Sequence, residues 1–129
     1  MNFAIVPPAW APYLRAALRV MAGLLLLEHG TGKLLHFPEI PGVAQMLGPT
    51  LLYVTGAIEL VGGALIIVGF LTRPAAFVLS GFMAVAYFMV HFPMGFFPVL
   101  NHGELAILYC FVFLYLAAAG PGPWAIDKA

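Results

Sequence analysis

The feature that most constrains this chain is an apolar run from Leu51 to Leu71 that carries a single charged residue, Glu59. A helix of about 20 apolar residues is long enough to cross the hydrocarbon core of a bilayer. In such a helix Glu59 would lie near the middle of the membrane, where an ionised side chain costs roughly 2.5–3.5 kcal/mol. We therefore expect a spanning helix in which Glu59 has a charged partner, a bound proton or access to water.

The composition extends this expectation to the whole chain. Hydrophobic residues make up 64% of the 129 residues and charged residues only 8%, whereas soluble domains average about 45–50% apolar and about 25% charged residues. The chain is therefore expected to be an integral membrane protein of one domain, residues 1–129. Five basic residues balance five acidic ones, so nothing predicts nucleic-acid binding. The single cysteine, Cys110, excludes an internal disulfide.

Stretches rich in proline and glycine divide the chain into four apolar segments. We expect transmembrane helices at about 13–35, 50–71, 75–91 and 102–119, with room for a short interfacial turn near 43–47. Short connections place neighbouring helices antiparallel. The predicted fold class is an all-α membrane protein, an up-down bundle of four transmembrane helices.

Basic residues are divided unevenly between the two ends of the predicted helices. One end holds Arg15, Arg19, Arg73 and Lys128, and the other holds Lys33 alone. Cytoplasmic loops carry an excess of Lys and Arg, so both termini are expected in the cytoplasm. The first ten residues contain no basic segment. We therefore expect the first helix to act as the targeting signal, without a cleavable signal peptide.

Two stripes that contain glycine predict how the first two helices pack. At about 100° per residue, one face of the first helix carries Arg19, Gly23, Gly30 and Lys33, and one face of the second carries Gly56, Glu59 and Gly63. Small residues let helices approach closely in a membrane. Packing these stripes together would place Glu59 between Arg19 and Lys33.

Further polar residues gather toward the end of the predicted bundle that holds Lys33. His91 closes the third helix and Glu104 opens the fourth. Glu28 lies roughly opposite Arg19 on the first helix, so it would face the fourth helix, a pore or another subunit. The candidate intramembrane cluster, for ligand binding or charge pairing, comprises six residues: Arg19, Glu28, Lys33, Glu59, His91 and Glu104.

Several of these residues also have a structural interpretation. Glu59 could be a charge partner without further function, and Arg19 could simply anchor the first helix at the lipid headgroups. Asn101 and Glu104 have the N-cap to N3 spacing of a capping box. The four histidines include no pair at helical ligand spacing, so no metal site is expected.

Motifs along the chain add a family resemblance. The first helix carries Arg19-x-x-x-Gly23 and Gly30-x-x-Lys33, and the second carries Glu59-Leu-x-Gly62-Gly63 followed by Gly69-x-x-Thr72-Arg73. Met83, Ala86 and His91 follow in the third helix, and the chain closes with Asn101-x-Gly103-Glu104, Gly120-Pro121-Gly122 and Asp127. In this order and spacing the set resembles the DoxX family of small four-helix membrane proteins, over about residues 19–127.

The resemblance implies a redox setting. Relatives of this kind include the membrane subunit of thiosulfate:quinone oxidoreductase and proteins of membrane-associated redox complexes. By that resemblance the positions expected to matter are Arg19, Lys33, Glu59, His91 and Glu104, while the glycines serve packing and Gly120 to Asp127 form the structural end of the bundle. The expected location is a bacterial-type plasma (inner) membrane.

The main hypothesis is therefore an integral membrane subunit of a redox complex, with a quinone as candidate cofactor. Its expected partners are the lipid bilayer and either a protein of that complex or a second copy of the chain. The alternatives are a small-solute binding or transport module, with charges along a water-filled path, and a non-catalytic scaffold. No nucleophile with its base, phosphate loop or metal-ligand pair is present in the sequence, so catalysis by the chain alone is not expected. A place as an oxidoreductase subunit stays open.

Overall fold

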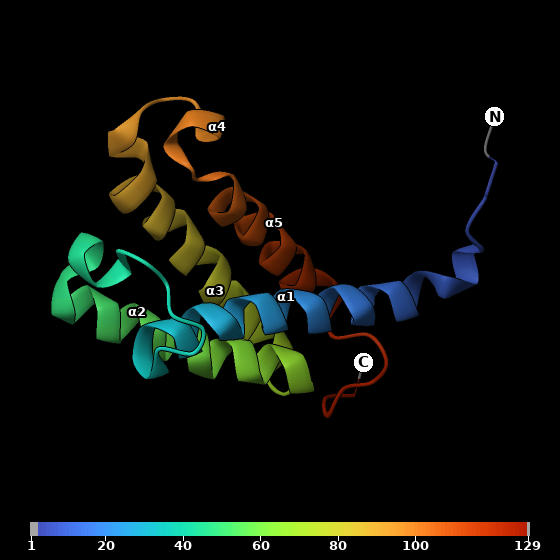
Figure 1. Cartoon of the computed structure of the whole chain (residues 1–129). Coiled ribbons are helices and arrows are strands. Elements are labelled where there is room, and N and C mark those ends of the chain that lie inside the picture. Colours follow the sequence, from blue (N-terminus) through green and yellow to red (C-terminus); the bar gives the residue numbers. More distant parts are fainter. Residues whose placement is uncertain (1–2, 129) are drawn as a thin grey trace. The chain divides into compact units, whose positions relative to one another are not determined.

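The protein is helical throughout the part of the chain that the structure describes. The computed structural model describes residues 3–128, and these contain no β-strand. The α-helices are α1 (Ala11–Leu35), α2 (Val43–Val68), α3 (Thr72–Ala86), α4 (Pro98–Asn101) and α5 (Glu104–Ala119) (Figure 1). Three short turns accompany them: η1 (Pro8–Trp10), η2 (Tyr87–His91) and η3 (Phe92–Met94), of which η2 is a π-helix.

Within residues 3–128, three helical segments are long and apolar enough to cross a bilayer, namely Pro8–Leu35, Val43–Val68 and Thr72–Met94. The fourth apolar helix, α5, has 16 residues. At about 1.5 Å per residue it is about 24 Å long, which is shorter than the roughly 30 Å hydrocarbon core. The chain is thus an all-α membrane protein, as the sequence predicts. An up-down bundle of four full spans is a narrower statement, and it stays a prediction.

The chain divides into two compact units. The first comprises the described residues of Met1–Phe70 and Pro121–Ala129, and the second comprises Leu71–Gly120. In the first unit α1 and α2 pack as an antiparallel pair, to which the C-terminal tail, residues 121–128, returns (Figure 1). In the second unit α3 packs against α5, and η2, η3 and α4 connect these two helices.

The start of the second long helix agrees with the sequence. Helix α2 is bounded by Val43 and Val68, but its backbone is not helical at Gly48, where φ is 74° and ψ is 168°, so the long helical part begins after Gly48, near the predicted residue 50. Glycine adopts this left-handed φ without the clash that a Cβ would cause. Pro49 then opens a new turn, to which its fixed φ is suited. The predicted break is therefore present at Gly48, and the predicted turn near 43–47 is a short helical segment before it.

The predicted third and fourth helices differ from the observed ones in where they begin. Helix α3 begins at Thr72 rather than near residue 75. The predicted fourth helix, about 102–119, agrees with α5 except that α5 begins at Glu104; before it, the short helix α4 ends at Asn101 and His102 has a left-handed φ of 61°. The capping-box prediction is wrong. Gly103 is the N-cap residue of α5, and the Asn101 Oδ1 accepts a hydrogen bond from the Gly103 N–H at 2.9 Å.

The glycine stripes of α1 and α2 pack against each other as the sequence predicts. A Cβ added to Gly30 would lie 2.6 Å from the backbone nitrogen of Leu60, and one added to Gly63 would lie 3.0 Å from that of Leu27. A Cβ on Gly23 would lie 3.1 Å from the carbonyl oxygen of Gly63. These distances leave no room for a side chain, so the glycines permit the close approach of the two backbones.

The second unit combines apolar packing with a polar link between α3 and α5. Phe113 and Leu116 are fully buried, and the rings of Tyr109 and Phe113 stack with centroids 5.5 Å apart. The Ser80 hydroxyl donates a hydrogen bond to the carbonyl oxygen of Cys110 at 2.7 Å. Ser80 thereby satisfies its buried hydroxyl across the interface between the two helices.

Candidate functional site

A charged pair lies between α1 and α2 in the first unit. The Lys33 ammonium is 2.6 Å from Oε1 of Glu59, and the two side chains are only 10% and 6% exposed. Lys33 is in the last turn of α1, and Glu59 lies well inside α2. The pair is neutral as a whole, so each residue offsets part of the cost of burying the other's charge. The structure thus brings two of the six predicted residues together.

Thr55 completes the surroundings of the Lys33 ammonium. It lies one turn before Glu59 on α2, and its hydroxyl oxygen accepts a hydrogen bond from Lys33 Nζ at 3.0 Å. The same hydroxyl donates to the carbonyl oxygen of Leu51 at 2.6 Å. Sequence reasoning does not single out Thr55, although its i, i+4 spacing from Glu59 places both on one face of the helix.

Gly56 allows the lysine to reach this position. A Cβ added at Gly56 would lie 3.1 Å from the Lys33 Cβ and 3.0 Å from side-chain carbons of Leu34. The stem of the lysine therefore lies directly against the backbone of α2. A larger residue at position 56 would push α1 away and lengthen the distance between the ammonium and Glu59.

Arg19 belongs to a different network. Its side chain is fully buried, so the interpretation of Arg19 as a headgroup anchor is wrong. The guanidinium donates hydrogen bonds to five backbone carbonyl oxygens, two at the end of α2 and three in the C-terminal tail: Ile66, Ile67, Pro121, Pro123 and Trp124. Along the seam Glu59 does lie between the levels of Lys33 and Arg19, but only Lys33 forms an ion pair with it among the described residues.

This network supplies hydrogen-bond donors to backbone carbonyl groups that have none within their own helix. The last four carbonyl groups of an α-helix have no donor within the helix, and Arg19 supplies donors at the end of α2. The tail adds two more, because the N–H groups of Ile126 and Asp127 donate to the carbonyl oxygens of Val68 and Gly69 at 3.0 and 2.8 Å. Arg19 therefore joins α1, the end of α2 and the tail.

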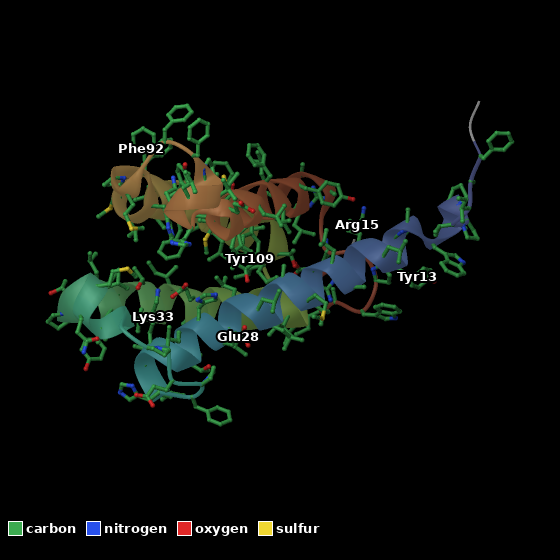
Figure 2. All side chains as sticks on the ribbon, turned by 45° about the horizontal axis from the view of Figure 1, so that its top comes forward. Tyr13, Arg15, Glu28, Lys33, Phe92 and Tyr109 are labelled. Carbon is green, nitrogen blue, oxygen red and sulfur yellow. The ribbon has the colours of Figure 1, made fainter. Side chains whose placement is uncertain are left out.

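Glu28 lies apart from the charged pair. It is exposed on α1 (Figure 2), on the face opposite the buried Arg19, as its spacing predicts. Its carbonyl oxygen accepts a hydrogen bond from the Thr31 hydroxyl at 3.2 Å. Glu28 is thus a carboxylate on the same hairpin as Glu59 that has no part in the ion pair with Lys33.

A second polar network connects η2 with α4 in the second unit. Asn101 is fully buried, and its Nδ2 donates to the Tyr87 hydroxyl at 3.0 Å and to the Gly95 carbonyl oxygen at 2.9 Å. His91 Nδ1 is 3.0 Å from the Asn101 carbonyl oxygen, and since a carbonyl only accepts, Nδ1 is the donor. Sequence reasoning missed Tyr87. Its hydroxyl accepts from Asn101 within a π-helical turn, which no sequence pattern predicts.

Glu104 is exposed at the first position of α5. A carboxylate is favourable there because of the partial positive charge at a helix N-terminus. It also borders a shallow groove that is otherwise apolar, lined by Pro98, Leu105, Ile107, Leu108 and Phe111. His91 and Glu104 therefore both lie in the second unit, the former in the Asn101 network and the latter facing outward. Within residues 3–128, no three His, Cys, Asp or Glu side chains gather as metal ligands would.

Comparison with known proteins places these features in a family. The DoxX family model matches residues 14–92, which is more than half of the chain. The chain belongs to the DoxX family. The matched region contains the charged pair, Thr55, Arg19 and His91, whereas Glu104 and the C-terminal tail lie beyond it.

Relatives of this DoxX protein cover most of its length. An uncharacterized protein of Haemophilus influenzae is 44% identical over 123 residues, 92% of each chain. The inner membrane protein YqjF of Escherichia coli is 30% identical over 85% of this chain and 86% of its own. The uncharacterized membrane protein Rv3486 of Mycobacterium tuberculosis is 29% identical over 94% and 88%. No solved structure gives a significant match.

Proposed function

We propose that this DoxX protein is the membrane subunit of a redox complex in the plasma (inner) membrane, and that it binds the polar head of a small lipophilic ligand, a quinone, beside Lys33. The observation that carries the proposal is the Lys33–Glu59 pair, a lysine and a carboxylate 2.6 Å apart within a helix hairpin of a membrane protein. Ionisable residues inside membrane helices commonly mark ligand or proton pathways.

The chemistry of the pair suits a ligand that carries carbonyl oxygens and travels within the bilayer. The Lys33 ammonium has three hydrogen-bond donors, and oxygens of Glu59 and Thr55 accept from two of them. A quinone carbonyl could replace the Thr55 hydroxyl as acceptor while Glu59 continues to balance the charge. A hydrogen bond from a charged donor is worth about 1.5–3 kcal/mol, enough to orient a quinone head.

The proposal assigns electron transfer to a partner protein. The chain contains one cysteine, and thus no cysteine pair that could cycle between thiol and disulfide. Its own contribution would be to hold the quinone and to anchor the partner in the bilayer. This division agrees with the resemblance to membrane subunits of redox complexes.

Quinone binding to the purified protein tests the proposal. Decylubiquinone is titrated into protein in detergent micelles, and binding is followed by isothermal titration calorimetry. The double variant Lys33→Met/Glu59→Gln, which leaves no unpaired charge, should bind at least about tenfold more weakly, a loss of about 1.4 kcal/mol. Glu28→Gln is the matched control, because Glu28 is on the same hairpin but outside the pair, and it should bind as the parent does.

Unchanged quinone affinity in a folded double variant would overturn the proposal. Circular dichroism of each variant shows whether the helices are retained. Absence of any saturable decylubiquinone binding by the parent protein would be equally decisive against it.

A scaffold function is the second candidate, and one observation favours it. The Lys33 ammonium already has both a carboxylate and a hydroxyl as partners, as in an ion pair that only locks α1 to α2. In that case Lys33→Met/Glu59→Gln should leave quinone-dependent activity of the membranes unchanged. Deletion of the whole protein should still reduce the amount of the partner complex in the membrane.

A further inference from the structure

An apolar surface covers the end of the second unit where α3 gives way to α4. We call it the aromatic foot: the segment from Phe88 to Asn101, which includes η3 and α4. Its large side chains point outward, with exposed fractions between 43% and 73%: Phe88, Met89, Phe92, Met94, Phe96, Phe97, Val99 and Leu100. Four of the rings form an edge-to-face or tilted series with centroids 5.3–6.4 Å apart: Phe88, Phe92, Phe96 and Phe97.

The aromatic foot lies in a long stretch without charge. Between Arg73 and Glu104 the sequence contains no Asp, Glu, Lys or Arg. A loop that enters water normally presents polar residues there. The titratable group in the foot is His91, whose Nδ1 is bound to the Asn101 carbonyl oxygen. The chemistry of this loop is thus that of a surface facing lipid.

Backbone N–H and C=O groups of the aromatic foot form hydrogen bonds within the foot. The N–H of Gly95 donates to the Phe92 carbonyl oxygen at 3.1 Å, and those of Leu100 and Asn101 both donate to Phe97 at 2.9 Å. The Gly95 carbonyl oxygen accepts from the Asn101 side chain at 2.9 Å. Non-helical backbone at membrane depth requires such internal hydrogen bonds, because lipid offers none. The Asn101 side chain thus supplies the hydrogen bond that a water molecule would supply to an exposed loop.

The lengths of the helices place the foot at the edge of the hydrocarbon core. Arg73 Nη1 donates to the Ala118 carbonyl oxygen at 2.6 Å, which sets the start of α3 level with the end of α5. From that level, α3 and η2 rise for 20 residues to His91, about 30 Å. Helix α5 rises only about 24 Å to Glu104. The segment between His91 and Glu104 must therefore pass from the boundary of the hydrocarbon core to a level inside it.

From these observations we infer that the aromatic foot inserts into the bilayer, with its phenylalanines among the acyl chains just below the headgroups. The occupant of this surface is the phospholipid bilayer. The foot continues an apolar exposed side of α3, where Phe77, Val78 and Val85 are exposed, without an intervening charge. Phenylalanine side chains insert favourably into the hydrocarbon region. The inference does not depend on the proposed quinone site, which is in the first unit.

Tryptophan fluorescence in liposomes tests the inference. The native tryptophans are replaced in the background Trp10→Phe/Trp124→Phe, and Phe96→Trp introduces a probe into the foot of the full-length protein. The matched control is Phe37→Trp, since Phe37 is 79% exposed where Phe96 is 73% but lies in a loop with His36 and Glu39. Vesicles of phosphatidylcholine and phosphatidylglycerol, with and without brominated acyl chains, receive each protein.

The Phe96→Trp protein should emit at shorter wavelength than the Phe37→Trp protein. Brominated lipid should quench it strongly, and aqueous iodide should quench it several-fold less than the control. Emission and iodide quenching equal to those of the control would overturn the inference. Shielding from both iodide and brominated lipid would also overturn it, because the foot would then be covered by protein. Phe97→Trp repeats the measurement if Phe96→Trp does not fold.

Discussion

At the scale of single residues, the Lys33–Glu59 pair illustrates why a buried charge is informative only together with its partner. The two side chains are almost inaccessible, and a single hydroxyl accompanies them. The desolvation cost of each charge is offset by the other, so the pair as a whole adds little to stability. Removing one member, however, leaves the other buried and uncompensated.

The substitution Glu59→Gln should therefore lower the free energy of unfolding by roughly 3–5 kcal/mol. Titration of the purified protein with sodium dodecyl sulfate in mixed micelles, followed by circular dichroism, measures the change. The control Glu28→Gln should change it by no more than about 0.5 kcal/mol, because Glu28 is exposed and outside the pair. The double variant Lys33→Met/Glu59→Gln should recover most of the loss. Equal effects of the two single substitutions would contradict the assignment.

Arg19 is a residue whose chemistry is specific to arginine. Its planar guanidinium serves five carbonyl oxygens on two segments, and a lysine ammonium has fewer donors and no fixed plane. Arg19→Lys should release the tail and lower the free energy of unfolding by at least about 2 kcal/mol. Hydrogen exchange at the Ile126 and Asp127 amides, which bind the end of α2, should accelerate.

Arg73→Lys provides the comparison for this prediction. Arg73 donates to Ala118 in the second unit, and the tail belongs to the first. Exchange at Ile126 and Asp127 should therefore stay as in the parent protein. If both substitutions accelerated exchange equally, the tail would not depend on the hydrogen bonds of Arg19.

At the scale of elements, the contact between α1 and α2 depends on glycines, whose lack of a side chain lets the two backbones approach closely. Gly30→Ala would place a Cβ 2.6 Å from the Leu60 nitrogen, and backbone cannot yield as a flexible side chain can. We expect a loss of about 1–3 kcal/mol in the free energy of unfolding. Gly81→Ala in α3 is the control, because no atom lies within 4 Å of its added Cβ. It should be neutral or stabilising by up to about 1 kcal/mol. A neutral Gly30→Ala would disprove the close seam.

The contact between the glycine stripes of α1 and α2 could be predicted because the spacing of residues in the sequence determines which of them share a face of a helix. Glycines seven residues apart on each helix, with Lys33 and Glu59 on the same stripes, determine both the interface and the ion pair. The membrane class followed from composition for an equally simple reason, since apolar length relates directly to bilayer thickness.

Other features could not be predicted because they depend on backbone groups, which every residue carries. The acceptors of Arg19 are carbonyl oxygens, one of them 102 residues away in the chain, and no side-chain pattern marks them. The capping box is predicted wrongly because Asn101 binds Gly103, Gly95 and Tyr87 rather than capping α5. Thr55 was missed because a lone threonine in an apolar helix usually binds its own backbone, as it also does here.

At the scale of the whole molecule, the first unit brings the start of α1 and the C-terminal tail to one end. Tyr13 and Trp124 place their rings 5.5 Å apart, and the tail is bound to the end of α2. The loop that joins α1 to α2 lies at the opposite end of the hairpin. Arg15 and Lys128 belong to the end that holds the tail, which the excess of positive charge on cytoplasmic loops predicts to be inside.

Cysteine labelling determines whether this end faces the cytoplasm. In a Cys110→Ser background, which removes the only native cysteine, Glu39→Cys marks the loop between α1 and α2, and Lys128→Cys marks the tail. With a membrane-impermeant maleimide applied to intact spheroplasts, Glu39→Cys should react, whereas Lys128→Cys should react only after permeabilisation. The Cys110→Ser parent should stay unlabelled under both conditions. Labelling of Lys128→Cys in intact spheroplasts would reverse the predicted orientation. It would also place Lys33, which is near the end of α1 beside that loop, toward the cytoplasmic side of the bilayer.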